Sequence, residues 1–202
     1  MRFRTLDDLG DVHGTRVLVR EDLNVPMADG FVTDDTRFRA TIPTVTELAD
    51  KGAVVLILAH FGRPNGPSTE LSLGQLAGPY SAVLGRPVHF VDWADDVASV
   101  AALNPGDIAI LENTRFFGGE ETNDPVVVAR FAALGDLYVN DAFSAAHRAH
   151  ASTEGLAHVL PAYAGRASSS ASIARPAKAG RTCANPSVEA CARCAAENAS
   201  FT

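Results

Sequence analysis

The sequence predicts an α/β fold, a three-layer Rossmann-like domain built on a mainly parallel sheet. Short apolar runs of strand length alternate along the chain with longer mixed segments of helix length. Helices placed between successive strands let those strands run parallel. The run AVVLILA at residues 53–59 is apolar throughout, which is typical of a strand buried on both faces of a parallel sheet.

Five strands and four helices are expected in order. The expected strands are residues 16–19, 53–59, 88–91, 108–111 and 137–140. The expected helices are residues 35–50, 73–84, 95–103 and 125–134. Gly52 favours an end to the first helix just before it, whereas Pro43 inside that helix predicts a kink or a late start. The pattern of residues 155–160 is ambiguous and is also compatible with a sixth strand.

Length and charge limit the domain count and the class of partner. The 202 residues, 47% of them hydrophobic, suffice for one globular domain. A formal net charge of −7 argues against nucleic acid or an anionic membrane as a partner. No apolar run reaches the ~18 residues of a membrane span, and the N-terminus lacks the apolar core of a signal peptide. A cytoplasmic location is therefore expected.

The last 36 residues differ in composition from the rest, since 11 are Ala and 6 are Ser. Such a segment buries too little apolar surface to offset its chain entropy. We therefore expect a domain over residues 1–166 and a disordered tail over residues 167–202. All three cysteines, Cys183, Cys191 and Cys194, lie in this tail. The last two have the spacing of half a zinc or redox site, but no second ligand pair accompanies them, so no metal site is expected.

Polar clusters follow four of the expected strands, where an open parallel sheet binds its ligands. The clusters are residues 20–26, 60–64, 112–116 and 140–150. In a parallel sheet, Arg37, Arg63, Arg115 and Arg148 would converge on one edge. Arginine suits phosphate and carboxylate because its planar fork donates two parallel hydrogen bonds. The joint placement therefore favours a site for a small anionic ligand.

Each of these residues also has an ordinary structural explanation. Asp22 and Asn24 are common turn residues, and His60 taken alone reads as a satisfied, partly buried histidine. In the joint arrangement, Gly62 would let the backbone approach a ligand closely. Asp22 beside cations would stay ionised and could accept a hydrogen bond from a substrate hydroxyl.

Sequence motifs for nucleotide binding are absent. The chain has neither a Gly-x-x-x-x-Gly-Lys-Ser/Thr loop nor a Gly-x-Gly-x-x-Gly turn. Its two lysines are Lys51, at an expected helix end, and Lys178, in the tail. Neither is placed to hold nucleotide phosphates, so no cofactor is expected to bind these residues.

The ordered series of clusters resembles the signature segments of the N-terminal, 3-phosphoglycerate-binding half of the phosphoglycerate kinase family. The segments are residues 20–26, 35–37, 60–64, 112–116 and 140–152. They come in the family's order and at similar spacing, and the resemblance covers residues 1 to about 166. Glu21 departs from the pattern, because most members are expected to have an apolar residue there.

The resemblance implies the glycolytic transfer of a phosphoryl group between 1,3-bisphosphoglycerate and ADP, giving 3-phosphoglycerate and ATP. It implies that Arg63, Arg115 and Arg148 hold mainly the 3-phosphate. Arg37 would be the catalytic residue, stabilising the phosphoryl group in transfer. The implied substrate-binding residues are Asp22, Leu23, Asn24, Arg37, His60, Phe61, Gly62, Arg63, Arg115 and Arg148. Family members are usually monomeric and hold Mg-ATP or Mg-ADP on a second α/β domain, which is absent from these residues.

Three interpretations of the chain stay open at the level of sequence. The tail resembles out-of-frame translation of a GC-rich gene, so the chain is interpretable as a phosphoglycerate kinase cut short, with a substrate site but no catalysis. The alternative interpretation is a non-enzymatic binding module for a small phosphorylated acid. In the third interpretation, a separate nucleotide-binding chain completes an active enzyme.

Overall fold

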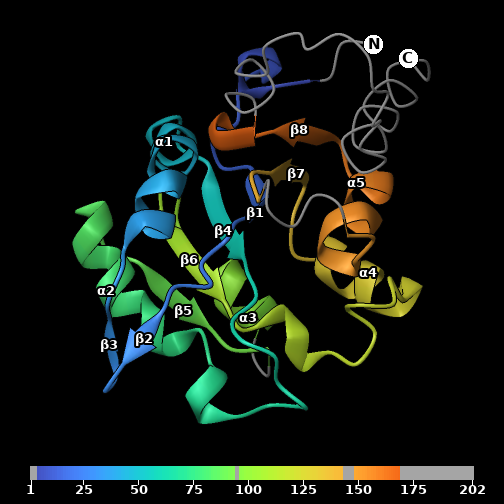
Figure 1. Ribbon diagram of the computed structural model, residues 1–202. Helices are drawn as coiled ribbons and strands as arrows, with labels where there is room; N and C mark the ends of the chain where they lie inside the picture. The colour runs from blue at the N-terminus through green and yellow to red at the C-terminus, as the bar shows by residue number, and fades with distance from the viewer. Residues whose placement is uncertain (1–3, 94–95, 143–147, 169–202) are drawn as a thin grey trace, which may run out of the picture.

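The computed structural model describes residues 4–93, 96–142 and 148–168. Within them, six strands form one sheet in the order β5-β6-β4-β1-β7-β8, and every neighbouring pair is parallel (Figure 1). The strands are β1 Arg16–Arg20, β4 Val54–Leu58, β5 His89–Val91, β6 Ile108–Leu111, β7 Leu137–Asn140 and β8 Ala162–Ala164. The expected parallel α/β fold is confirmed.

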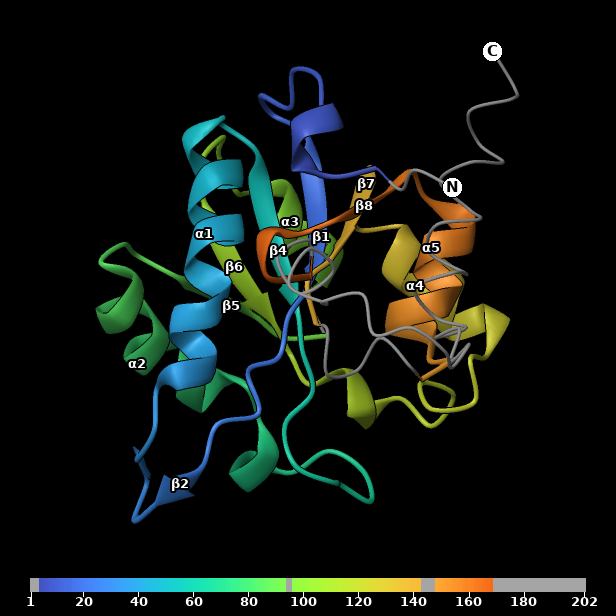
Figure 2. The ribbon, with the colours of Figure 1, turned by 45° about the horizontal axis from the view of Figure 1, so that its top comes forward.

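Helices cover both faces of the sheet and complete the three layers (Figure 2). Helices α1 Thr36–Asp50 and α2 Gly74–Leu84 lie on one face. Helices α3 Asp96–Ala101, α4 Pro125–Ala132 and α5 Leu156–Val159 lie on the other. Side chains alternate between the two cores, since Val17 and Val19 of β1 join the first and Leu18 joins the second. This burial on both faces explains why the strand sequences are largely unbroken apolar runs.

Strand β1 lies inside the sheet and its carboxyl end is level with those of its neighbours. Arg20 is in register with Leu58 at the end of β4 and with Asn140 at the end of β7. The loops that follow these strands therefore emerge along one edge. This is the edge on which the sequence places its polar clusters.

Two local expectations are corrected by the structure. Helix α1 runs from Thr36 to Asp50 with Pro43 inside it, so the late start is wrong. Residues 155–160 are not a strand, because a π-helical turn at Ala151–Gly155 leads into α5 and the sixth strand is β8. Gly155 explains the difference: a β-carbon there would lie 2.4 Å from Val128 Cγ2 of α4, so this turn packs directly against that helix.

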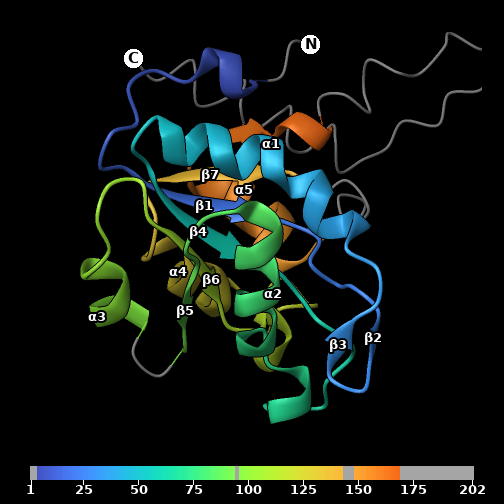
Figure 3. The same ribbon diagram turned by 90° about the vertical axis from the view of Figure 1, so that its left-hand side faces the viewer.

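Over the described residues, a short hairpin and three 3₁₀ turns add to the expected elements. The antiparallel strands β2 Met27–Ala28 and β3 Phe31–Val32 project beyond the start of α1 (Figure 3). Asp29 and Gly30 between them both have positive φ, as an Asp-Gly hairpin turn requires. The 3₁₀ turns are η1 Leu6–Asp8, η2 Thr69–Leu71 and η3 Thr114–Phe116.

Contacts with the body continue past the expected boundary at residue 166. The Arg166 guanidinium pairs with Glu47 at 2.7 Å and with Asp7 at 2.8 Å. The Ser168 amide donates a hydrogen bond of 2.8 Å to Asp141. The expectation of a disordered tail otherwise falls on residues 169–202, which lie outside the described residues. Of the helices described, none has the length and apolar character needed to cross a membrane.

Candidate functional site

Hydrogen bonds tie the loops after β1, β4 and β6 into one surface. The Asn24 side-chain oxygen accepts from the Gly62 amide at 3.0 Å, and the Asn24 amide donates to Asp22 at 3.1 Å. Arg115 Nη1 donates to the Gly62 carbonyl at 2.6 Å. Gly62 has φ +62°, a left-handed conformation that favours glycine. The structure thus brings together four of the residues chosen from sequence.

A buried asparagine that the sequence analysis did not single out organises this surface from below. Asn113 is fully buried, and its amide group donates at 2.8 Å to the carbonyls of Phe61 and Leu71. Its side-chain oxygen accepts from the amides of Phe61 and Arg115. One side chain therefore fixes the backbone of the loops after both β4 and β6. The only sequence signal for it is a polar residue two positions after the end of a buried strand.

Arg37 and Asp22 form an ion pair at the rim of this surface. Arg37 lies in the first turn of α1, and its side chain is 47% exposed, against 18% for Asp22. The pair holds the Arg37 guanidinium over the end of β1 and leaves part of it open to solvent. This location suits a cation that would contact a ligand bound at the carboxyl edge of the sheet.

Cations gather around a hollow next to these loops. Arg63, Arg115 and Glu121 line a cavity of about 320 Å³, together with uncharged residues of the two loops. The Arg115 side chain is only 8% exposed and pairs with Glu121 at 2.9 Å. Burial lowers the pKa of Arg115; the Glu121 carboxylate opposes this, whereas Arg148, Arg20 and Arg63 add to it by repulsion. A gathering of arginines of this kind is typical of a site for an anion.

His60 lies at the end of β4 and is held in its neutral form. Burial, together with the charges of Arg20, Arg115 and Arg148, lowers the pKa of His60 to about 3, against a smaller opposing effect of Asp22. The ring nitrogen Nδ1 lies 2.9 Å from Nη2 of Arg20. His60 is thus a neutral hydrogen-bonding group among cations, and it carries no charge of its own near pH 7.

Three of the candidate residues predicted from sequence are placed differently from the rest. The side chains of Leu23 and Phe61 are buried in the core under α1 and α2, so only their backbone groups can face a ligand. Arg148 is exposed, and its carbonyl accepts from Thr153 Oγ1 at 2.7 Å. Its charge acts on both His60 and Arg115, which places it on the same side of the molecule.

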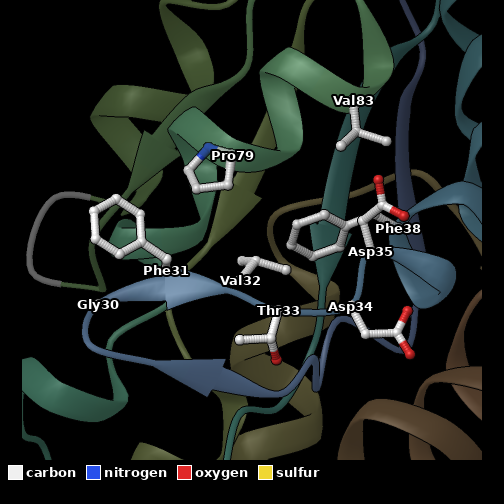
Figure 4. Close-up of a pocket in the computed structure, with 9 residues that line it drawn as sticks. All are labelled: Gly30, Phe31, Val32, Thr33, Asp34, Asp35, Phe38, Pro79 and Val83. Atoms are coloured by element: carbon white, nitrogen blue, oxygen red, sulfur yellow. The ribbon is translucent and has the colours of Figure 1, made fainter.

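A second, larger hollow has a different chemistry. It measures about 720 Å³ and lies between the hairpin and α2, where Phe31 and Val32 are opposite Pro79 and Val83 (Figure 4). Its only charged lining residues are acidic, Asp34 and Asp35. This hollow does not suit an anion. Over the described part of the chain, no cluster of three or more His, Cys, Asp or Glu residues could hold a metal ion; the three cysteines lie outside that part.

The fold and the candidate site define a parallel α/β protein with a cationic edge at the carboxyl ends of its strands. The family model for phosphoglycerate kinase matches residues 6–177. The chain belongs to the phosphoglycerate kinase family, as the resemblance of its strand-end motifs indicates.

Similar proteins agree with this assignment. The chain is 74% identical over 168 residues to a phosphoglycerate kinase of Novosphingobium aromaticivorans, covering 83% of this chain and 42% of that protein. It is 68% identical over 171 residues to one of Zymomonas mobilis, covering 83% and 43%. The structure of phosphoglycerate kinase from Coxiella burnetii superposes with a TM-score of 0.77 at 37% identity, covering 86% of this chain and 44% of that one. The chain thus spans about two fifths of the length of these relatives.

Proposed function

We propose that the cationic edge binds 3-phosphoglycerate and 1,3-bisphosphoglycerate, as the substrate-binding part of a phosphoglycerate kinase. The observation that carries the proposal is the gathering of Arg63, Arg115 and Arg148 beside the backbone-anchored loop of Asp22 and Asn24. The arginines suit the dianionic 3-phosphate. Asp22 and Asn24 supply an acceptor and an amide for the hydroxyl and carboxyl end of the glycerate.

Arg37 has a separate role in this proposal. Transfer joins a carboxylate oxygen of 3-phosphoglycerate to the terminal phosphorus of ATP and breaks the bond to ADP, and the carboxylate needs no general base because it is already ionised. The protein's contribution is then positioning and charge stabilisation. The partly exposed Arg37 guanidinium is suited to the negative charge of the phosphoryl group in transfer.

The nucleotide would be held elsewhere than at this edge, since the 202 residues contain no glycine-rich phosphate loop. Binding of Mg-ATP or Mg-ADP, a monomeric state and a cytoplasmic location complete the proposal by family. On this basis, the polypeptide of 202 residues should bind 3-phosphoglycerate without converting it. ATP-dependent turnover by the purified polypeptide, clearly above an enzyme-free blank, would show that it is a complete enzyme instead.

Calorimetric titration of two variants tests the division of roles. Arg148→Ala should weaken 3-phosphoglycerate binding about 10- to 100-fold, because a lost charge-assisted hydrogen bond is worth roughly 1.5–3 kcal/mol. Arg37→Ala should weaken binding much less, since a group that acts only in the transition state leaves ground-state affinity nearly unchanged. Arg86→Ala is the matched control, because Arg86, in the turn between α2 and β5, pairs with Asp50 at the end of α1, away from this edge.

Ionic strength must be fixed throughout, because the ligand is a polyanion. An equal or larger loss for Arg37→Ala would assign Arg37 to ground-state binding of the carboxylate. Unchanged binding in both variants would place the ligand somewhere other than this edge.

A further inference from the structure

A charged side chain lies beneath the candidate site without reaching its surface. Arg20, the last residue of β1, is 1% exposed and heads the fully buried side chains by size. Placing a guanidinium in the interior is costly unless its donors and its charge are matched. The groups around it therefore indicate what it does there.

All three nitrogens of the Arg20 guanidinium have an acceptor. Nε donates to Ser152 Oγ at 3.0 Å, and Nη1 donates to the Glu21 carbonyl. Nη2 lies 2.9 Å from Nδ1 of His60. Because the guanidinium is planar, these contacts fix both its position and its orientation.

The contact with Ser152 is itself held in place by a buried carboxylate. The Ser152 hydroxyl donates to Glu120 Oε1 and its amide donates to Oε2 at 3.0 Å. Tyr138 donates its hydroxyl hydrogen to the Ser152 carbonyl at 3.0 Å. With its proton committed to Glu120, the Ser152 oxygen presents lone pairs to Arg20. Glu120, also 1% exposed, supplies the opposite charge nearby.

The contact with His60 decides which ring nitrogen carries the proton. An arginine has donors only, so the nitrogen opposite Nη2 must accept. Nδ1 of His60 is therefore unprotonated, and a neutral ring then carries its proton on Nε2. Nε2 points away from Arg20 and has no hydrogen-bond partner among residues 4–93, 96–142 and 148–168. It is available as a donor on the ligand side.

We propose that Arg20 is a positioning residue that holds His60 as the Nε2–H tautomer, so that the ring offers a fixed hydrogen-bond donor to an oxygen of the bound acid. This inference rests on the proposed function for the identity of the ligand, but its structural part concerns the ligand-free protein. Arg20 touches the ligand only through His60. The buried Glu120 and Ser152 are the supports that keep Arg20 in place.

The tautomer is measured directly by long-range ¹H–¹⁵N NMR of the ligand-free chain labelled with ¹⁵N. An unprotonated ring nitrogen resonates far from a protonated one, and the His60 signals are those missing from a His60→Gln spectrum. We expect an unprotonated Nδ1 and a protonated Nε2 for His60, unchanged between about pH 5 and pH 8, although an unperturbed imidazole titrates near pH 6.5. A protonated Nδ1, or a charged ring in this range, would overturn the proposal whether or not the ligand binds.

Substitution of Arg20 tests whether Arg20 determines the tautomer of His60. Arg20→Lys keeps the charge but cannot bond all three acceptors, so it should give a mixture of His60 tautomers and weaken 3-phosphoglycerate binding about 10-fold. Tyr80→Phe is the control, because it removes a buried hydroxyl bonded to Thr41 and touches none of the cationic groups. It should leave both the His60 spectrum and the affinity unchanged. A pure Nε2–H tautomer in a folded Arg20→Lys protein would refute the role of Arg20.

Two substitutions at His60 remain informative if Arg20→Lys does not fold. A glutamine places its amide nitrogen near the position of Nε2, whereas an asparagine places it near that of Nδ1. His60→Gln should therefore bind 3-phosphoglycerate at least about 5-fold more tightly than His60→Asn. Equal binding, or tighter binding by His60→Asn, would contradict a donor at Nε2. If wild type shows no binding, the proposed function fails while the tautomer measurement still decides the role of Arg20.

Discussion

The suppressed ionisation of His60 should make the fold less stable in mild acid. Burial, followed by Arg20, Arg115 and Arg148, lowers the pKa of His60 to about 3 in the folded chain, against a smaller opposing effect of Asp22. The unfolded chain takes up a proton near pH 6.5. A base with a lowered folded pKa favours folding above pH 6.5, and this contribution is lost as the pH falls toward 3.

The size of this loss of stability follows from the shift in the pKa of His60. A pH of about 5 lies about 1.5 units below the pKa of a free histidine. At this pH the unfolded histidine is therefore protonated and the folded one is not. At about 1.4 kcal/mol per unit, the folded state loses about 2 kcal/mol relative to a residue that does not titrate. Glutamine is such a residue, so it separates the His60 contribution from every other titrating group.

Urea denaturation of wild type and His60→Gln, each at about pH 7.5 and about pH 5, measures this difference. Between the two pH values, wild type should lose about 2 kcal/mol more unfolding free energy than the variant. His89→Gln, a swap at a half-exposed position of β5, controls for the change of residue type. Equal losses in wild type and His60→Gln would refute the buried, neutral state of His60.

Three further outcomes are expected. Burial raises the pKa of Glu21 well above its usual range, with Asp141 adding to the effect. The contribution of Glu21 to the unfolding free energy is therefore present at a pH below the usual pKa of glutamate and should be lost as the pH rises. Glu21→Gln should reduce that loss, measured by urea denaturation at several pH values. Asn113→Ala removes four hydrogen bonds that involve its side chain, and it should cost about 3 kcal/mol of unfolding free energy; a loss below about 1 kcal/mol would contradict its organising role. Asn24→Ala frees the Gly62 amide and should weaken 3-phosphoglycerate binding about 10-fold with little change in urea midpoint, whereas equal affinity would remove this loop from the site.

The sheet was largely predictable from sequence because its strands are buried on both faces. Such strands must be apolar throughout, and Val54–Leu58 is the clearest case. The edge residues were predictable for a related reason. Once the strands are parallel, the polar groups after β1, β4, β6 and β7 emerge together, whatever the details of the loops.

The parts that sequence did not predict depend on contacts between distant segments. In the sequence, Arg20 does not differ from the other cations at the edge. Its burial depends on Ser152 and Glu120, which come more than ninety positions later along the chain. Asn113 reads as an ordinary loop residue until the two loops it joins lie side by side. The helical turn at Ala151–Gly155 depends on the close approach of Gly155 to α4. The Asp29-Gly30 hairpin differs, since its turn signal lies in the local sequence itself.

In the proposed function, the cationic edge is the site for 3-phosphoglycerate. Amide NMR of the ¹⁵N-labelled chain, titrated with 3-phosphoglycerate at fixed ionic strength, tests it most directly. We expect saturable shifts centred on the amides of Asn24, Gly62 and Arg115, with the amides around Phe31 at the second hollow unmoved. Shifts centred on Phe31, or no saturable shifts at millimolar ligand, would contradict it.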